Sequence, residues 1–140
     1  MSPIESREAV LFANEAFYRA FADRDLSAMN RAWLKEGSVA CIHPGWPALH
    51  ERAQIMETWA QIFDNADNDP PAEIRGVRCM VMGDSAIVLC YEVFGDGALV
   101  ATNVFQRVGA IWALAHHHAS PTANVPKPNR EEEAAERVLN

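Results

Sequence analysis

Three polar side chains interrupt apolar runs in the second half of the chain, and their types are those of acid–base chemistry. Glu92 follows Val88 and Cys90 at alternate positions, so a strand would place all three side chains on one face. Asn103 interrupts the next apolar run, and His117 lies in the last one. A carboxyl group in an apolar cavity has a raised pKa and serves as a general base or acid. A nearby amide would hold a carbonyl or enolate oxygen, and an imidazole would move a second proton.

Each of these residues also has an interpretation that involves no substrate. Glu92 could pair with Arg78 or Arg107 as a carboxylate at the edge of a strand. Asn103 could satisfy backbone groups at a bulge. The alternation of side chains does not say which face of a sheet is concave, so both interpretations stay open at this point.

The elements that would position these residues follow from the spacing of the apolar side chains. Helical spacing predicts three helices, over residues 3–22, 25–32 and 51–65. A strand-like period predicts one short strand and four long ones, over residues 38–43, 74–82, 85–94, 98–108 and 111–120. Short glycine-containing turns join the four long strands, and such turns connect antiparallel neighbours. We therefore expect an α+β domain in which three N-terminal helices pack on a mainly antiparallel sheet.

Length and charge narrow the class of protein. The chain has 140 residues, is 49% hydrophobic and carries a net charge of −7. We expect one domain over residues 1–120, then a proline-rich linker and a marginal C-terminal helix over 121–140. The acidic balance argues against a nucleic-acid partner. No apolar run is long enough for a membrane helix, and three cysteines without paired spacing favour a reduced, cytoplasmic protein.

Two segments carry a family resemblance: the loop His43-Pro44-Gly45-Trp46, and a closing strand that runs from Trp112 through three histidines to Ser120. With the order of the elements, they resemble the nuclear-transport-factor-2-like superfamily, and its SnoaL-like bacterial members in particular. The resemblance implies a cystatin-like, ketosteroid-isomerase-like cone, in which a curved mixed sheet wraps around a long helix and leaves an apolar pocket. It also implies a homodimer through the outer face of the sheet. Because such folds host both enzymes and non-catalytic modules, the fold does not decide the activity.

The resemblance also implies where a site would lie. The polar pocket positions on the three long strands of such proteins match Glu92, Asn103 and His117, which we take as the candidate catalytic residues. The loop of His43 and Trp46 would lie at the mouth of the cone, with Trp46 as an apolar lid. Six residues are expected to contact a small apolar ligand: His43, Trp46, Tyr18, Trp33, Phe94 and Phe105.

The three consecutive histidines suggest a metal site only weakly. Strict alternation places His116 and His118 on one face, together with Trp112 and Leu114, and His117 on the other. No cysteine or carboxylate lies nearby at a supporting spacing. We therefore expect no metal and no cofactor, and we place His116 and His118 on the outer face of the sheet or in a dimer interface.

Two functions fit these residues. One is a cofactor-free isomerase, cyclase or dehydratase that acts by general acid–base chemistry on a small apolar or aromatic carbonyl compound. The other is a non-catalytic ligand-binding or dimeric assembly module with the same pocket. A pocket group that titrates between about pH 6 and 8 favours the enzyme, whereas an arginine paired with Glu92 favours the binding module.

Overall fold

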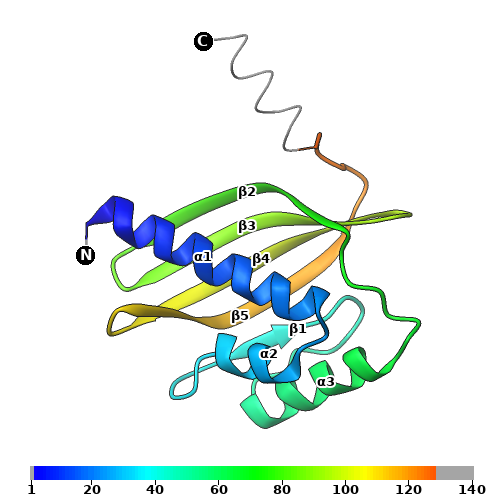
Figure 1. Ribbon diagram of the computed structural model, residues 1–140, viewed down its shortest axis with the longest axis horizontal. Helices are drawn as coiled ribbons and strands as arrows, with labels where there is room; N and C mark the ends of the chain where they lie inside the picture. Colours follow the sequence, from blue (N-terminus) through cyan, green and yellow to red (C-terminus); the bar gives the residue numbers. More distant parts are fainter. Residues whose placement is uncertain (1, 129–140) are drawn as a thin grey trace.

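The computed structural model describes residues 2–128. Helix α1 (Pro3–Ala22) runs along much of the long axis of the molecule (Figure 1). Ser2 begins the helix because its hydroxyl accepts a hydrogen bond from the Glu5 amide, and Pro3 occupies the first helical position. A short helix, α2 (Leu26–Ala32), follows and is capped by the side chain of Asp25. Helix α3 (Arg52–Asp64) packs beside α2 at one end of the molecule.

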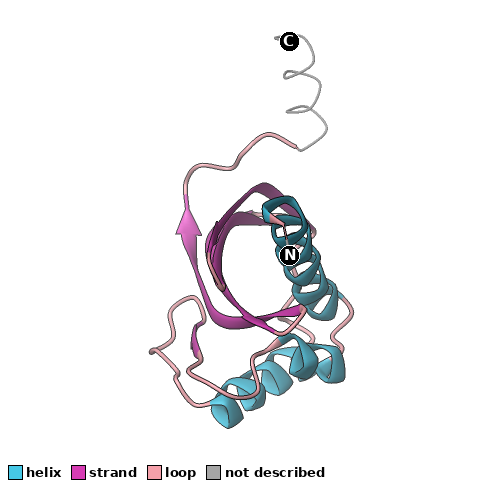
Figure 2. Ribbon diagram, turned by 90° about the vertical axis from the view of Figure 1, so that its left-hand side faces the viewer, coloured by secondary structure: helices cyan, strands magenta, loops and turns pink. Residues whose placement is uncertain are grey.

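The strands form one five-stranded sheet with the order β1-β5-β4-β3-β2. Their bounds are β1 (Ala40–Ile42), β2 (Glu73–Met82), β3 (Ser85–Phe94), β4 (Gly97–Val108) and β5 (Ile111–Thr122). β1 runs parallel to β5, and every other pair is antiparallel. Figure 2 shows the long strands curling around α1. The predicted α+β architecture, with three N-terminal helices and a mixed, mainly antiparallel sheet, is confirmed.

A bulge in β5 changes which side chains face the interior. Asn103 pairs with His117 and Phe105 pairs with Leu114, so β5 has one more residue than β4 over this stretch. The extra residue puts Leu114 and His117 on the same, inward face, and their side chains are 0% and 2% exposed. The expectation that Trp112 and Leu114 share a face with His116 and His118 was therefore wrong, because strict alternation fails at the bulge. Trp112 lies in the core.

Strand β5 ends at Thr122, slightly beyond residue 120, where the sequence predicted its end. The segment after it contacts the sheet: the Arg75 guanidinium donates a hydrogen bond to the carbonyl of Pro126. The C-terminal helix that the sequence predicts over the last residues lies outside the described residues. No helix in the described part of the chain is both long and apolar enough to cross a membrane.

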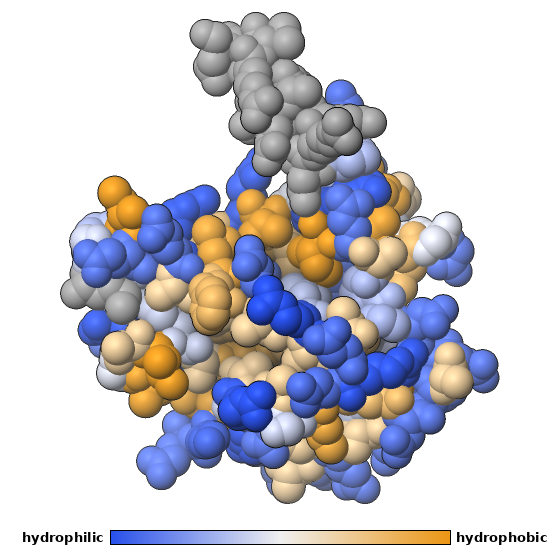
Figure 3. Space-filling view, in the orientation of Figure 1, coloured by the Kyte–Doolittle hydropathy of each residue, from blue (hydrophilic) through white to orange (hydrophobic). Residues whose placement is uncertain are grey.

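The core fills the space between α1 and the concave face of the sheet. Val10 and Phe17 on α1 meet Val88 of β3 and Phe105 of β4, and all four side chains are fully buried. On the face that carries α1, hydrophobic side chains are interspersed among hydrophilic ones (Figure 3). The burial of one face of α1 thus fixes the helix against the sheet, and the site lies beyond this packed part.

Arg24 ties the end of α1 to the end of α3. Its guanidinium donates hydrogen bonds to the carbonyls of Ile62, Phe63, Asn65 and Asn68. The last carbonyls of a helix lack partners within the helix, so a cationic donor there satisfies them and complements the helix dipole. Arg24 therefore holds the connector of residues 65–72, which leads from α3 to β2.

We predict that Arg24→Ala lowers the free energy of unfolding by about 1–3 kcal/mol, because several carbonyls lose a charged donor. Urea denaturation near neutral pH measures the loss. Arg31→Ala is the matched control, since Arg31 is exposed on α2 and donates only to the nearby Ser27 hydroxyl. Equal stability of the two variants would contradict this role for Arg24.

Candidate active site

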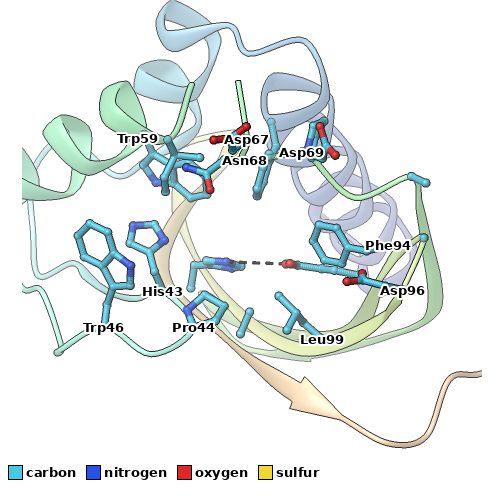
Figure 4. A pocket seen from close by; sticks show the side chains of 18 residues that line it. His43, Pro44, Trp46, Trp59, Asp67, Asn68, Asp69, Phe94, Asp96 and Leu99 are labelled. Atoms are coloured by element: carbon cyan, nitrogen blue, oxygen red, sulfur yellow. Dashed lines mark ion pairs between the residues drawn. The ribbon is translucent and has the colours of Figure 1, made fainter. Parts of the chain in front are cut away.

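A cavity of about 1030 Å³ opens at the end of the sheet where β3 turns into β4 (Figure 4). Its walls are aromatic and aliphatic, formed by Phe21, Trp46, Trp59, Ile62, Phe94 and Leu99. Glu92 and His117 lie among these apolar side chains. The bend of the sheet around α1 therefore places a carboxyl group and an imidazole in a largely apolar hollow.

The structure brings together five of the nine residues that the sequence singled out. Those that line the cavity are Glu92 and Phe94 from β3, His117 from β5, and His43 and Trp46 from the loop after β1. The other four, Tyr18, Trp33, Asn103 and Phe105, do not line it.

Glu92 is the most unusual of the lining residues, because its carboxyl group is buried without a cationic partner among the described residues. The side chain is 1% exposed, and the Tyr18 hydroxyl donates a 2.7 Å hydrogen bond to Oε2. The second oxygen, Oε1, accepts no hydrogen bond from the described residues. The two arginines considered as partners bind elsewhere: Arg107 pairs with Asp84, and Arg78 donates to the carbonyl of Val77.

Burial sets the protonation of this carboxyl group. It raises the pKa of Glu92 from 4.5 to about 7, and the hydrogen bond from Tyr18 opposes the rise by stabilising the carboxylate. Tyr18 and Cys90 also lie against the carboxyl group, but burial raises the pKa of both, so each is neutral at pH 7. Near neutral pH, Glu92 therefore exists in comparable amounts as acid and as base.

His117 faces Glu92, with 3.8 Å between Nε2 and Oε2, a pair that the dashed line in Figure 4 marks. Burial, together with smaller effects of the neighbouring His43, His116 and His118, lowers the pKa of His117 to about 3. The imidazole is therefore neutral near pH 7. Because 3.8 Å is too long for a hydrogen bond, the two groups are neighbours that a substrate atom or a water molecule could bridge.

Asn103 decides which nitrogen of His117 carries the proton. Its Nδ2 donates to Asn14 Oδ1 at 2.9 Å and to the Tyr18 hydroxyl at 3.1 Å, so its Oδ1 is the acceptor for His117 Nδ1 at 2.6 Å. Nδ1 must therefore hold the proton, and Nε2, toward Glu92, is free to accept one. Asn103 is fully buried and its amide is used within the protein. It therefore positions His117 and Tyr18, and the role that the sequence suggested for it, holding a substrate oxygen, stays a prediction.

His43 forms part of the wall at the mouth of the cavity. Its imidazole is neutral and donates a hydrogen bond to Thr58. The Thr58 hydroxyl donates to the carbonyl of Ile55, so it accepts from His43 Nε2 at 2.8 Å. Burial lowers the pKa of His43 to about 4. Trp46 packs edge-on against His43 with 5.3 Å between ring centroids and stays 41% exposed. The Trp46 side chain therefore lines the mouth of the cavity, where the sequence predicted an apolar lid.

The other aromatic residues that the sequence singled out do not line the main cavity. Trp33 and Phe105 are fully buried in the core, and the backbone of Trp33 bridges to Leu114. Tyr18 borders a smaller cavity of about 440 Å³ between α1 and β2, which Asn14 also lines. Tyr18 thus reaches Glu92 from behind the main cavity through its hydroxyl.

The site predicted from the sequence did not include Asn14 or Thr58, nor three aspartates at the mouth, Asp67, Asp69 and Asp96. A signal for Asn14 was present, since it lies four residues after Val10 and four before Tyr18, within the inward stripe of α1. A buried amide in such a stripe needs a polar partner across the core. Thr58 and the aspartates give no comparable signal, because their roles depend on how loops meet.

On the other face of β5, His116 and His118 point away from the cavity, with 6.3 Å between their ring centroids. Across residues 2–128, no group of three or more histidine, cysteine or acidic side chains is arranged to hold a metal ion. The structure therefore offers no ligand set there for the metal hypothesis that the three consecutive histidines raised.

Comparison with known proteins agrees with this geometry. The model of the SnoaL-like domain matches residues 10–124. The chain belongs to the SnoaL-like domain family. A crystal structure from Streptomyces avermitilis, provisionally named a dehydratase of the NTF2-like family, is 34% identical with a TM-score of 0.75, over 88% of this chain and 100% of that one. The SnoaL-like chain thus has the NTF2-like, cystatin-like fold.

Two further relatives of this SnoaL-like domain have different names. A structure from Thiobacillus denitrificans, provisionally named an association domain of calcium/calmodulin-dependent protein kinase type II, is 34% identical with a TM-score of 0.67, over 79% of this chain and 92% of that one. The F-box protein SKIP8 of Arabidopsis thaliana is 30% identical over 114 residues, which are 80% of this chain. The chain spans about half the length of that plant protein.

We predict that nitrogen-15 NMR of the imidazoles finds His117 protonated at Nδ1 and unprotonated at Nε2 near neutral pH. In Asn103→Leu the acceptor for Nδ1 is lost, so the proton should move to Nε2. Stability should fall by about 1–3 kcal/mol as buried donors lose their partner.

The control for this experiment is Thr102→Val, on the opposite face of the same strand, which should leave the tautomer unchanged. A proton on Nε2 in the unaltered protein would refute the role assigned to Asn103.

Proposed function

We propose that the protein is an enzyme that moves protons on a small, largely apolar molecule, using its own side chains as acid and base. The supporting observation is the arrangement of Glu92 and His117, a carboxyl group with a pKa of about 7 beside a neutral imidazole nitrogen. A general acid or base is most effective when its pKa lies near the working pH. Dehydration, isomerisation and cyclisation of carbonyl compounds can all use two such groups.

A dehydration illustrates how the pair would work, and the provisional name of the Streptomyces avermitilis structure favours this form of the chemistry. In one concerted step, protonated Glu92 gives its proton to the leaving hydroxyl group while Nε2 of His117 takes a proton from carbon. The carboxylate that forms lies 3.8 Å from Nε2 and stabilises the imidazolium, whose pKa is low as long as Glu92 is neutral. A double bond forms, the C–O bond breaks and water leaves. The imidazolium then returns its proton to the Glu92 carboxylate, directly or through one water molecule, which restores both groups.

Tyr18 and Asn103 support these steps from behind the cavity. The Tyr18 hydroxyl holds Oε2 of Glu92 and stabilises the carboxylate that forms when the proton leaves. Asn103 holds the proton on Nδ1 of His117 and accepts a stronger hydrogen bond when the imidazolium forms. Trp46 and Phe94 would enclose the apolar body of the substrate at the mouth.

We predict that Glu92→Gln changes how stability depends on pH. The carboxyl group keeps its proton in the folded protein between about pH 4.5 and pH 7, whereas the unfolded chain releases it. The free energy of unfolding therefore falls as pH rises through this window, by up to about 3 kcal/mol. Glutamine removes this contribution, so the stability of Glu92→Gln relative to the unaltered protein should rise from pH 4.5 to pH 7.

The comparison uses urea denaturation of both proteins across this pH range. His43 and His117 have lowered pKa values and affect stability in the opposite direction, but they are present in both proteins and cancel in the difference. Glu57→Gln, on the exposed side of α3, should show no such trend. A difference between Glu92→Gln and the unaltered protein that does not change with pH would count against the proposal.

A second candidate function is that of a dimeric assembly module. The similarity to the Thiobacillus denitrificans association domain favours it. The outward face of the sheet carries an apolar row where Ile87 of β3 pairs with Val104 of β4. Leu89 beside it is 38% exposed. We propose that a second copy of the chain covers this face, with His116 and His118 at its border.

We predict a dimer in sedimentation at micromolar concentration. Leu89→Lys should give a monomer, because a charge in the middle of the face would be buried without a partner. Phe12→Lys is the control, since Phe12 is exposed on α1, on the other side of the sheet. A monomeric unaltered protein would remove the dimer proposal but would leave the acid–base proposal in place.

A further inference from the structure

The cavity contains carboxyl groups but no cation. Among the described residues that line it, four are acidic, namely Glu92, Asp67, Asp69 and Asp96, and none is lysine or arginine. The two histidines that line it, His43 and His117, are neutral near pH 7 because burial lowers their pKa values. A ligand that enters therefore meets negative charge without a positive group to balance it.

These carboxyl groups lie on two sides of the opening. In Figure 4, Asp67, Asn68 and Asp69 lie on one side, on the connector between α3 and β2, and Asp96 lies across the opening in the turn between β3 and β4. The Arg24 guanidinium binds the carbonyls of this connector and does not line the cavity. Its hydrogen bonds hold the connector that carries Asp67 and Asp69.

Aromatic rings occupy the walls between this rim and the floor. Trp59 and Trp46 flank His43, with 4.9 Å and 5.3 Å between the respective ring centroids, and Phe94 lies near Asp96. The face of an aromatic ring attracts a cation, and tryptophan attracts it most strongly. A cleft of one charge sign with walls of low dielectric also concentrates ligands of the opposite sign.

Glu92 supplies independent evidence about the inner end of the ligand. Its side chain is 1% exposed, and Oε1 is left without a hydrogen bond from the described residues in a carboxyl group that borders the cavity. An anionic group of a ligand placed here would be desolvated beside a carboxyl group with no cation to pair with it, which is costly. A neutral polar group, such as a hydroxyl or a carbonyl, would fit between Glu92 and His117.

From these observations we infer that the substrate is an organic ammonium compound with an apolar body. Its positive group would lie at the rim, among the aspartates and near the exposed ring of Trp46. Its neutral, reacting end would lie against Glu92 and His117. Carboxylates, phosphates and other anions would be rejected. This inference rests on the proposed function, because it names the substrate class of the same cavity.

The test uses three probes that share one frame: 4-phenylbutylamine, 4-phenylbutanol and 4-phenylbutanoate. Their affinities are measured at low ionic strength near neutral pH, by NMR titration of the indole N–H signals of the tryptophans. The amine should bind at least about ten times more tightly than the carboxylate, with the alcohol between them. The ratio should shrink as salt is added, because the rim charges are exposed to solvent.

Substitution of the aspartates at the rim tests whether their charges cause the preference for the amine. In Asp67→Asn/Asp69→Asn, the preference for the amine over the carboxylate should fall by about threefold or more. The control, Glu5→Gln/Glu8→Gln, removes the same charge from exposed positions on α1 that do not line the cavity, and should keep the preference. A carboxylate that binds as tightly as the amine, no detectable binding of the amine, or an equal effect of both double variants would overturn the inference.

The result of this experiment is independent of the test of the proposed function. Loss of the charge preference would leave the titration of Glu92 unchanged. A Glu92 that is ionised well below neutral pH would remove the acid–base proposal, but the selection of cations would still be expected.

Discussion

Glu92 shares a buried space with neutral groups, and none of the described ones neutralises the charge of its carboxylate. In most proteins a buried carboxylate is paired with a cation or held by several donors. Here the Tyr18 hydroxyl is the hydrogen-bond donor to the carboxyl group among the described residues, and the carboxyl group responds by retaining its proton to a higher pH. The fold must therefore be stable enough to keep this group out of water. Packing of α1 on the concave face of the sheet provides that stability, since it covers Tyr18, Asn103 and their partners together.

The network behind the cavity follows from that constraint. One amide, that of Asn103, serves Asn14 and Tyr18 from α1 and His117 from β5. Because Nδ2 donates to Asn14 and Tyr18, Oδ1 accepts from His117, so the tautomer of His117 is set by the protein before any ligand arrives. The bulge in β5 is equally necessary, because it keeps His117 on the inward face while Trp112 and Leu114 fill the core beside it. A regular strand would present either the core side chains or the imidazole, but not both.

The sequence predicted much of the architecture because its elements have clear periods and glycine-containing turns. It also identified Glu92 and His117, since a carboxyl group and an imidazole in apolar strands are conspicuous. It did not predict the inward direction of Leu114, because a bulge leaves no mark on the alternation of side chains. It did not predict the hydrogen bonds of Asn103, since one strand does not reveal that Asn14 and Tyr18 will meet that amide from a helix far away in sequence. The acidic rim was missed for a similar reason: it forms only when the connector after α3 meets the turn after β3.

The central claim is that Glu92 exchanges its proton near neutral pH, inside a cavity that is open to a ligand. The most direct measurement is the titration of its side-chain carboxyl carbon by carbon-13 NMR, assigned by comparison with Glu92→Gln. The structure predicts a single titration centred near pH 7. A carboxyl signal that titrates at or below the ordinary value of about 4.3 would show that the group is solvated or paired with a cation, and would contradict the claim.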